Sequence, residues 1–218
     1  MSKTVFFLRH GQTDGNRSWH HQHDDMGLFH TGRTQAEAIA SILATKQIDL
    51  IIASPLARAK ETASLVAQHM ETPIEESELL TELRRPSELI GTSWFSIKSI
   101  YAMGMLYLKA HTPHWHYSDE ENLGEFRDRT FAALEMLAAR PEQTILVVTH
   151  RGFMSALEER MKRDGKGTIG QYRRALWKNL RINNCCFLTA HWSPEGENGE
   201  TLTGTWTVEP NITCPTKE

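Results

Sequence analysis

The sequence is poor in cysteine, has no strong excess of either charge, and lacks long apolar runs. Its 218 residues carry a net charge of −3, with 23% charged residues, which argues against a surface for nucleic acid or anionic membranes. No window of about 20 apolar residues is present, so no membrane-spanning helix is expected. The chain begins with a predicted core strand rather than a signal peptide, and we expect a cytoplasmic protein.

The three cysteines predict buried thiols rather than a disulfide framework. Cys185 and Cys186 are adjacent inside a predicted strand at 183–192. Neighbouring strand residues point to opposite faces, so a bond between these two would strain the strand pairing. An odd number of cysteines in this placement favours a reducing compartment.

Apolar runs alternate with amphipathic helical patterns along the chain. Buried strands are predicted at 3–8, 49–53 and 145–149, and a hairpin is predicted at the C-terminal end. Continuous apolar strands that alternate with helices indicate a largely parallel sheet covered on both faces. We expect one α/β domain over 1–218, built as a three-layer α/β/α sandwich. A helical insertion at about 84–122 is expected to cover the active site.

The first strand ends in Arg9-His10-Gly11. An arginine offers a forked guanidinium to an anion, a histidine offers a nucleophile, and a glycine lets the backbone approach closely. This arrangement predicts a site that handles phosphate.

A second arginine, Arg58, follows the second strand. Ser54 is a plausible N-cap and Pro55 a favoured first helical residue, so Arg58 is predicted in the first turn of a helix. A cation near the positive end of a helix dipole is disfavoured, and a bound anion relieves the conflict. The alternative is an ion pair between Arg58 and Glu61 or Glu82.

A second histidine, His150, ends the third buried strand. Ligands of open α/β sheets bind at the carboxyl ends of the strands, so His150 and His10 are expected to face one site. Taken alone, His150 also fits a histidine that is simply hydrogen-bonded at a strand end.

In combination these motifs resemble the signature of the histidine phosphatase superfamily, whose founding members are the cofactor-dependent phosphoglycerate mutases. The resemblance runs from residue 5 to about residue 157. It rests on Arg9-His10-Gly11 followed by Asn16, on Asp25-x-x-Leu28-x-x-x-Gly32-x-x-Gln35-Ala36, on Ser54-Pro55-Leu56-x-Arg58-Ala59-x-x-Thr62-Ala63, and on Val148-Thr149-His150. It implies a phosphoglycerate mutase-like fold.

The resemblance also implies roles for these residues in hydrolysis of a small phosphomonoester. His10 would take the phosphoryl group as a phosphohistidine, and Glu82 would give a proton to the departing oxygen, with Glu88 as a rival acid. The phosphate would be held by Arg9, Arg58, His150 and Asn16. Two guanidiniums supply the required positive charge, so no metal or cofactor is expected.

Two features depart from the family pattern or lie outside it. Arg151 stands where the family usually has glycine; it either recognises a second anionic group of the substrate or faces solvent or a structural partner. The segment 84–122 carries an apolar stripe that predicts a packed helix: Ile90, Trp94, Ile97, Tyr101, Met105 and Leu108. The histidine and aromatic cluster at 111–117 either binds an organic leaving group or forms a loop tip.

Three other interpretations stay open. His20 with His23 or Asp24 would suit zinc, although the spacing fits no strong template and a polar loop is favoured. A mutase would retain the phosphoryl group on its histidine and return it to substrate. A relative without catalysis would only bind phosphorylated partners. The physiological substrate and the oligomeric state are not predicted.

Overall fold

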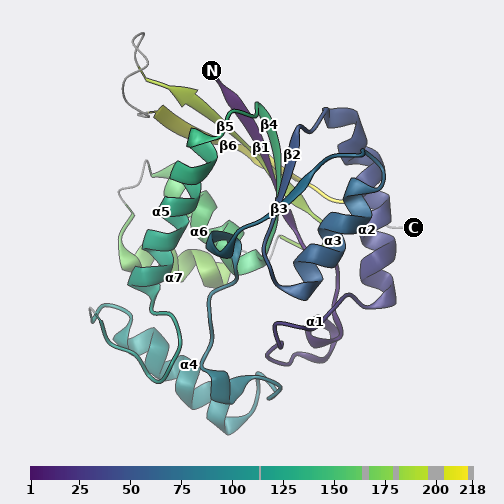
Figure 1. Cartoon of the computed structure of the whole chain (residues 1–218). Coiled ribbons are helices and arrows are strands. Elements are labelled where there is room, and N and C mark those ends of the chain that lie inside the picture. Colours follow the sequence, from purple (N-terminus) through teal and green to yellow (C-terminus); the bar gives the residue numbers. More distant parts are fainter. Residues whose placement is uncertain (113, 164–166, 179–181, 196–203, 216–218) are drawn as a thin grey trace.

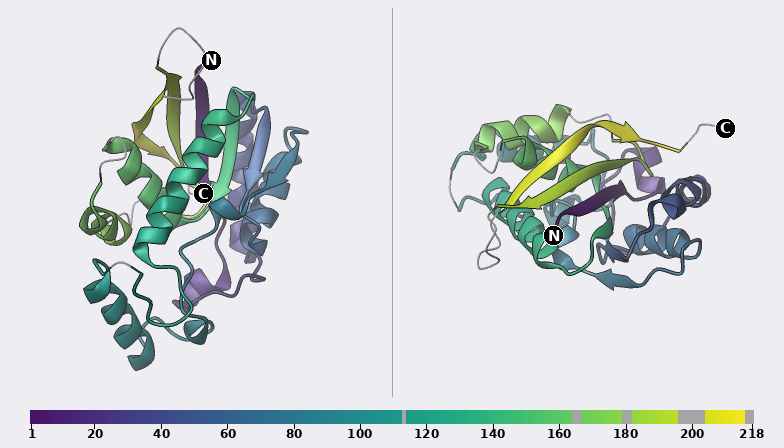
Figure 2. Two further views of the ribbon diagram at one scale, coloured as in Figure 1. Left: turned by 60° about the vertical axis from the view of Figure 1, so that its left-hand side comes forward. Right: turned by 90° about the horizontal axis from the view of Figure 1, so that it is seen from above.

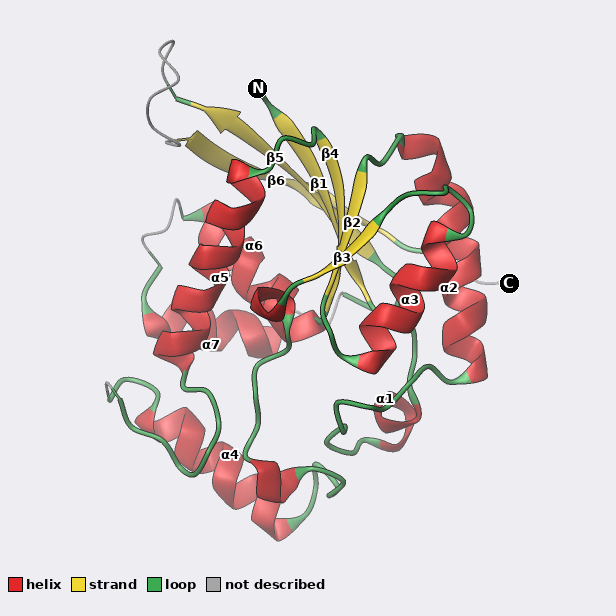
Figure 3. Cartoon of the chain, in the orientation of Figure 1, coloured by secondary structure: helices red, strands yellow, loops and turns green. Residues whose placement is uncertain are grey.

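The computed structural model describes residues 1–112, 114–163, 167–178, 182–195 and 204–215. Figures 1 and 3 show a central sheet with helices on both sides. Its strands are β1 (Lys3–Arg9), β2 (Leu50–Ala53), β3 (Ile74–Glu76), β4 (Thr144–Thr149), β5 (Phe187–Pro194) and β6 (Gly204–Thr213). Its α-helices are α1 (Asp14–Ser18), α2 (His30–Leu43), α3 (Ala57–Ala67), α4 (Ile97–Lys109), α5 (Leu123–Ala139), α6 (Arg151–Lys162) and α7 (Ile169–Lys178).

The six strands form one sheet in the order β3-β2-β4-β1-β5-β6. The pairs β3–β2, β2–β4 and β4–β1 are parallel, whereas β5 is antiparallel to β1 and β6 to β5. The predicted parallel sheet and C-terminal hairpin are therefore confirmed. Because β1 and β4 are direct parallel neighbours, the residues that follow them meet at the same edge of the sheet.

The sheet separates two hydrophobic cores. Along β1, Val5 and Phe7 face the side covered by α5, α6 and α7, and Phe6 and Leu8 face the side covered by α2 and α3. The central strands are thus buried on both faces, which is why their sequences are continuously apolar. Figure 2 shows the helices on both sides of the sheet. The three-layer prediction is confirmed.

Helix α4 lies apart from the sheet, at the edge where the parallel strands end (Figure 1). The predicted apolar stripe does not pack against the protein: the side chains of Ile97, Tyr101 and Leu108 are 88%, 61% and 72% exposed. Ile90 also lies before the helix begins. The prediction of a packed stripe is wrong because helical spacing identifies one face of a helix but not what that face meets.

Helix α3 begins later than predicted. Its first residue is Ala57 and its N-cap is Leu56, so Ser54 and Pro55 lie in the preceding turn. The Ser54 side chain instead contacts His150, with an oxygen–nitrogen distance of 2.9 Å. Arg58 still falls in the first helical turn, as predicted.

The cysteines do not all stay as thiols. Cys186 forms a disulfide with Cys214, whereas Cys185 is free and buried. Strand β5 begins at Phe187, so both adjacent cysteines precede it. The thiol prediction is wrong at Cys186 because the β5–β6 ladder, in which Phe187 pairs with Thr213, places Cys214 opposite Cys186. The cysteine content is therefore no argument for a reducing compartment.

Among the helices in the described ranges, none is long and apolar enough to cross a membrane. Two sequence predictions fall in part outside the described residues: Pro113 in the 111–117 cluster, and residues 196–203 of the predicted C-terminal hairpin.

The disulfide leads to a prediction about stability. It closes a 28-residue separation and restricts the unfolded chain, so Cys214→Ser should lower the free energy of unfolding by about 3 kcal/mol without reductant. Urea titration of both proteins measures the difference. With reductant present the two proteins should be equally stable; equal stability without reductant would contradict the disulfide.

Candidate active site

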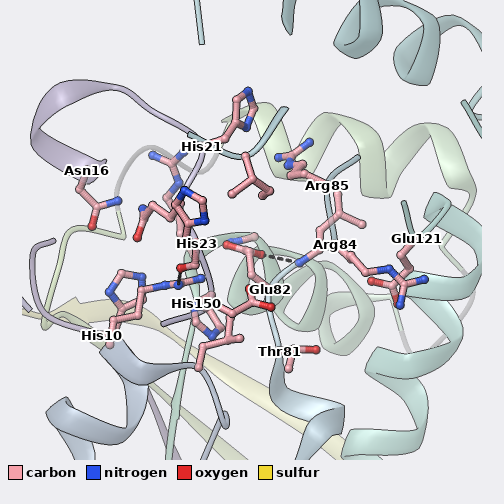
Figure 4. A pocket seen from close by; sticks show the side chains of 18 of the residues that line it. His10, Asn16, His21, His23, Thr81, Glu82, Arg84, Arg85, Glu121 and His150 are labelled. Carbon is pink, nitrogen blue, oxygen red and sulfur yellow. Dashed lines mark hydrogen bonds between the residues drawn. The ribbon is translucent and has the colours of Figure 1, made fainter. Parts of the chain in front are cut away.

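A cavity of about 770 Å³ lies at the carboxyl edge of the parallel strands. The predicted site residues line it together: Arg9, His10, Asn16, Arg58, Glu82, His150 and Arg151. Figure 4 shows His10, His150 and Glu82 in this cavity. Residues from four separate regions of the chain thus surround one space, because β1, β2 and β4 all end at this edge.

His10 is buried at the floor of the cavity, and its ring orientation is defined by one hydrogen bond. Its Nδ1 lies 2.7 Å from the carbonyl oxygen of Gly11 and donates to it, which leaves Nε2 as the unprotonated nitrogen of the neutral ring. Burial, followed by the charges of Arg58 and Arg9, lowers the pKa of His10 well below its usual range. The ring is therefore neutral at physiological pH.

The backbone around His10 is held by close contacts between loops. The Gly11 N–H donates to the Thr62 hydroxyl at 3.0 Å, and that hydroxyl donates to the carbonyl of Arg58 at 2.7 Å. A Cβ on Gly11 would lie 2.5 Å from the carbonyl oxygen of Gly32, so only glycine allows this approach. These contacts join the first arginine motif to the second.

Arg9 and Arg58 bring positive charge to the cavity without a carboxylate partner among the described residues. Arg9 Nη1 donates to the carbonyl of Ile182 at 2.8 Å, and Arg58 Nη1 donates to the carbonyl of His23 at 3.1 Å. The Nε atoms of both arginines are buried and unpaired in the described part of the chain. The alternative, an ion pair of Arg58 with Glu61 or Glu82, is not found in the described part of the chain, where Glu61 binds Arg33 at 2.6 Å and Glu82 accepts from the backbone at the start of α6.

Burial lowers the pKa of Arg9 to about 10, with the charge of Arg151 as the next cause. Buried charges normally have counter-ions, and buried polar atoms normally have hydrogen-bond partners. An anion bound between Arg9 and Arg58 would satisfy both requirements.

His150 lies next to His10, with 5.1 Å between the ring centroids. Its Nε2 is 2.9 Å from the Ser54 hydroxyl, whereas its Nδ1 is buried with no partner among the described residues. Burial, the charge of Arg58 and the proximity of His10 lower the pKa of His150 well below its usual range.

Glu82 is anchored at the start of α6. Its carboxyl oxygens accept hydrogen bonds from the backbone N–H groups of Gly152 at 3.0 Å and Phe153 at 3.2 Å. A Cβ on Gly152 would lie 2.4 Å from a Glu82 oxygen, so the glycine makes room for the carboxylate. The rival acid, Glu88, lies outside the residues that line the cavity and pairs with Lys98 at 3.1 Å.

Asn16 reaches the cavity from α1. Its Oδ1 accepts from the side chain of Asn184 at 3.2 Å, and Asn184 also donates to the carbonyl of His10 at 2.9 Å. Asn184 is a positioning residue that the sequence did not reveal, since nothing near it carries a recognisable motif. Thr62 and Ser54 do lie inside the second arginine motif, but the motif alone predicted neither the contact of Thr62 with Gly11 nor that of Ser54, an expected N-cap, with His150.

The histidine-rich loop at 20–25 lines the mouth of the cavity. In the described part of the chain no three histidine, cysteine, aspartate or glutamate side chains are grouped to hold a metal ion. His21 Nε2 instead lies 3.1 Å from the Ser99 hydroxyl, and burial lowers the pKa of His21 to about 4. The loop thereby connects the cavity to α4, and the polar-loop interpretation fits its contacts.

The fold and the site define a class of phosphate-handling enzyme, and sequence comparison agrees. The chain belongs to the histidine phosphatase superfamily (branch 1), whose family model matches residues 5–203. It is therefore an enzyme of the phosphatase class, and the family prediction is confirmed.

Individual relatives support this class. The chain is 30% identical over 155 residues to the uncharacterized phosphatase PhoE of Bacillus subtilis, covering 70% of this chain and 74% of the relative. It is 27% identical over 164 residues to glucosyl-3-phosphoglycerate phosphatase of Mycolicibacterium vanbaalenii, covering 71% and 72%. The solved structure of a mycobacterial glucosyl-3-phosphoglycerate phosphatase superposes with a TM-score of 0.74 at 22% identity, covering 96% of this chain and 98% of that one. This last likeness confirms the fold.

Because His10 and His150 are buried as neutral rings, we expect the free energy of unfolding to decrease as the pH is lowered. Their folded-state pKa values lie below the ordinary value of 6.5, so only the unfolded chain takes up protons as pH falls through 6.5. Each histidine should then cost up to about 1.4 kcal/mol of unfolding free energy per pH unit. Urea titrations between pH 7 and pH 5 should show a shallower pH slope for His150→Asn, while the exposed His69→Asn keeps the wild-type slope. An unchanged slope in His150→Asn would contradict the burial of a neutral ring.

Proposed function

We propose that this protein hydrolyses small phosphomonoesters through a phosphohistidine formed on His10. The proposal rests on the neutral His10 ring, whose Nδ1 donates to the Gly11 carbonyl. Arg9 and Arg58 line the same cavity as this ring. An unprotonated imidazole nitrogen is a competent nucleophile. Two guanidiniums that pair with no carboxylate among the described residues are suited to bind a phosphate.

In the first step, His10 Nε2 attacks phosphorus and the bond from phosphorus to the alcohol oxygen breaks. Glu82 gives its proton to that oxygen, and the alcohol leaves. Arg9, Arg58 and His150, with Asn16 as a further donor, stabilise the charge on the other phosphate oxygens. Donors that are already positioned and partly desolvated lower the barrier without reorganising during the reaction.

In the second step, water attacks the phosphohistidine and the nitrogen–phosphorus bond breaks. The Glu82 carboxylate takes a proton from this water, so the same group acts as acid and then as base. Phosphate leaves, and His10 returns to its neutral form. Glu82 is chosen over Glu88 because only Glu82 lines the cavity.

A small substrate is supported by the size of the cavity and by the names of the relatives, which include a sugar-acid phosphate phosphatase. We treat 1–218 as one catalytic unit, with 84–122 as a cap over the cavity. The cap carries α4, whose residue Ser99 binds the loop residue His21 at the cavity mouth.

Substitution at the two central residues should separate chemistry from binding. His10→Ala should abolish phosphate release from phenyl phosphate, and Arg58→Ala should lower kcat/KM by about 10²–10³, the cost of removing one preorganised charge donor. Protein incubated with ³²P-labelled substrate and quenched in alkaline denaturant, in which phosphohistidine is stable, should carry label in wild type and none in His10→Ala.

Phosphate release by His10→Ala at the wild-type rate would overturn the proposal. So would wild-type conversion of 3-phosphoglycerate to 2-phosphoglycerate in the presence of a bisphosphoglycerate primer without release of free phosphate, because that outcome identifies a mutase. Arg17→Gln, an exposed arginine paired with Asp14, serves as the control that keeps wild-type activity.

Gly152→Ala tests the position of Glu82. The added methyl group would overlap a Glu82 oxygen, so proton donation should weaken. The loss in kcat should be at least about tenfold with an alkyl phosphate, as part of the ~10²–10⁴ that acid catalysis typically contributes, and small with 4-nitrophenyl phosphate, whose leaving group needs little protonation. Glu82→Gln should show the same substrate dependence, and the double variant should lose little more. Equal losses with both substrates would count against Glu82 as the acid.

A further inference from the structure

A second cavity, of about 1050 Å³, adjoins the first beneath α4. Leu83, Arg85, Trp94 and Arg151 line both cavities, so these residues stand at the junction between them. A phosphomonoester held at His10 would therefore project its alcohol portion past this junction and under the cap.

The walls of the second cavity are largely apolar. Ile100, Met103 and Tyr107 line it from α4, Trp115 from the loop after that helix, and Leu176 from α7. Ile100 and Tyr107 border this cavity while staying partly open to solvent, whereas Ile97, Tyr101 and Leu108 line neither cavity. Ligand sites are typically apolar spaces with a few placed polar groups, which matches this cavity.

Four charged residues line both cavities: Arg84, which is exposed, Glu121, whose carboxylate is paired with Arg129, and the guanidiniums of Arg85 and Arg151. Neither Arg85 nor Arg151 has a carboxylate within ion-pair distance among the described residues. Among the described residues, the Arg85 side chain contacts Met103, with 3.3 Å between its Nη1 and the Met103 sulfur. Arg129 provides a contrast: it lines the first cavity too, but it is neutralised by Glu121 at 2.6 Å and bonded to backbone carbonyls.

The two guanidiniums also repel each other. Burial lowers the pKa of Arg85, and although the Glu82 carboxylate opposes this shift, the charge of Arg151 adds to it. Arg151 likewise lowers the pKa of Arg9. Positive charge therefore continues from the phosphate position to the junction, and Figure 4 shows His10 and Arg85 on opposite sides of the cavity. An anionic group at the junction would relieve this repulsion.

We propose that Arg85 and Arg151 form a second anion subsite, and that the substrate is a phosphomonoester whose alcohol portion carries a carboxylate and an apolar or aromatic body. The phosphate occupies the His10 end, the carboxylate lies at the junction, and the apolar body lies under α4. The proposal rests on the proposed function, since that function places the phosphate.

A binding experiment tests the charged subsite independently of turnover. The probes are two non-hydrolysable naphthylmethyl phosphonates, identical except that one carries a carboxylate. Wild type should bind the carboxylated probe on the order of tenfold more tightly by calorimetry, as a charge-assisted contact predicts. Arg85→Gln and Arg151→Gln should each lose most of this preference. The control Arg127→Gln, which removes an arginine paired with Asp128 outside both cavities, should keep it.

The apolar part of the proposal has its own test at Gly104. A Cβ at this position meets nothing within 4 Å, and Gly104 lines the second cavity, so Gly104→Phe should fill space without disturbing α4. This variant should weaken binding of the naphthyl probes at least fivefold and leave binding of methylphosphonate unchanged. Leu108→Phe, on the exposed side of α4, should change neither.

The results separate this subsite from the proposed function. Equal binding of the two naphthyl probes by wild type, or a preference that survives in both arginine variants, overturns the subsite even if His10→Ala abolishes hydrolysis. Loss of the preference in the arginine variants, with His10→Ala fully active, supports the subsite and overturns the proposed function. Unchanged naphthyl binding in Gly104→Phe overturns the apolar part.

Discussion

The parallel pairing of β1 with β4 brings His10 and His150 to one edge of the sheet, and the chemistry of the site depends on it. In this pairing Arg9 lies opposite Thr149, so the two histidines leave their strands side by side. Strand β2, the other neighbour of β4, delivers Arg58 through the first turn of α3. The sheet thus concentrates positive charge around a neutral imidazole in a buried place, where charge without a counter-ion is costly. The phosphate of the proposed substrate would supply the missing negative charge.

Among the described residues, unpaired positive charge also extends from the His10 end of the cavity toward the proposed cap. Glu82 is held by the first turn of α6, and Arg151, the first residue of that helix, faces the junction below α4. The acid and the second anion subsite are therefore positioned by one helix N-terminus. Because α4 turns an apolar face toward this space and a second apolar face toward solvent, the cap can enclose a substrate without contributing to the two sheet cores.

The predictions that were wrong concern residues whose partners in space the sequence does not show. The apolar spacing in α4 identified a helix face but not that it meets solvent. The adjacent cysteines were considered as a pair with each other, whereas Cys186 forms a disulfide with Cys214, just beyond the Phe187–Thr213 pair at the end of the β5–β6 ladder. Ser54 has the residue type of an N-cap, yet its hydroxyl contacts His150 from a turn that precedes the helix. In each case the local pattern allowed two partners, and packing selected one.

The amino-acid sequence alone determined the class of fold and the set of chemical groups. Continuous apolar strands require cover on both faces, and each of the motifs at Arg9-His10-Gly11, Arg58 and His150 follows one such strand. Only the tertiary structure decided which groups share a space, because that depends on strand order and on the helices that follow. It placed Glu82 but not Glu88 among the residues that line the first cavity, and it placed Arg151 and Arg85 where both line the two cavities. Those choices arise from contacts between segments far apart in the chain, and no local spacing encodes them.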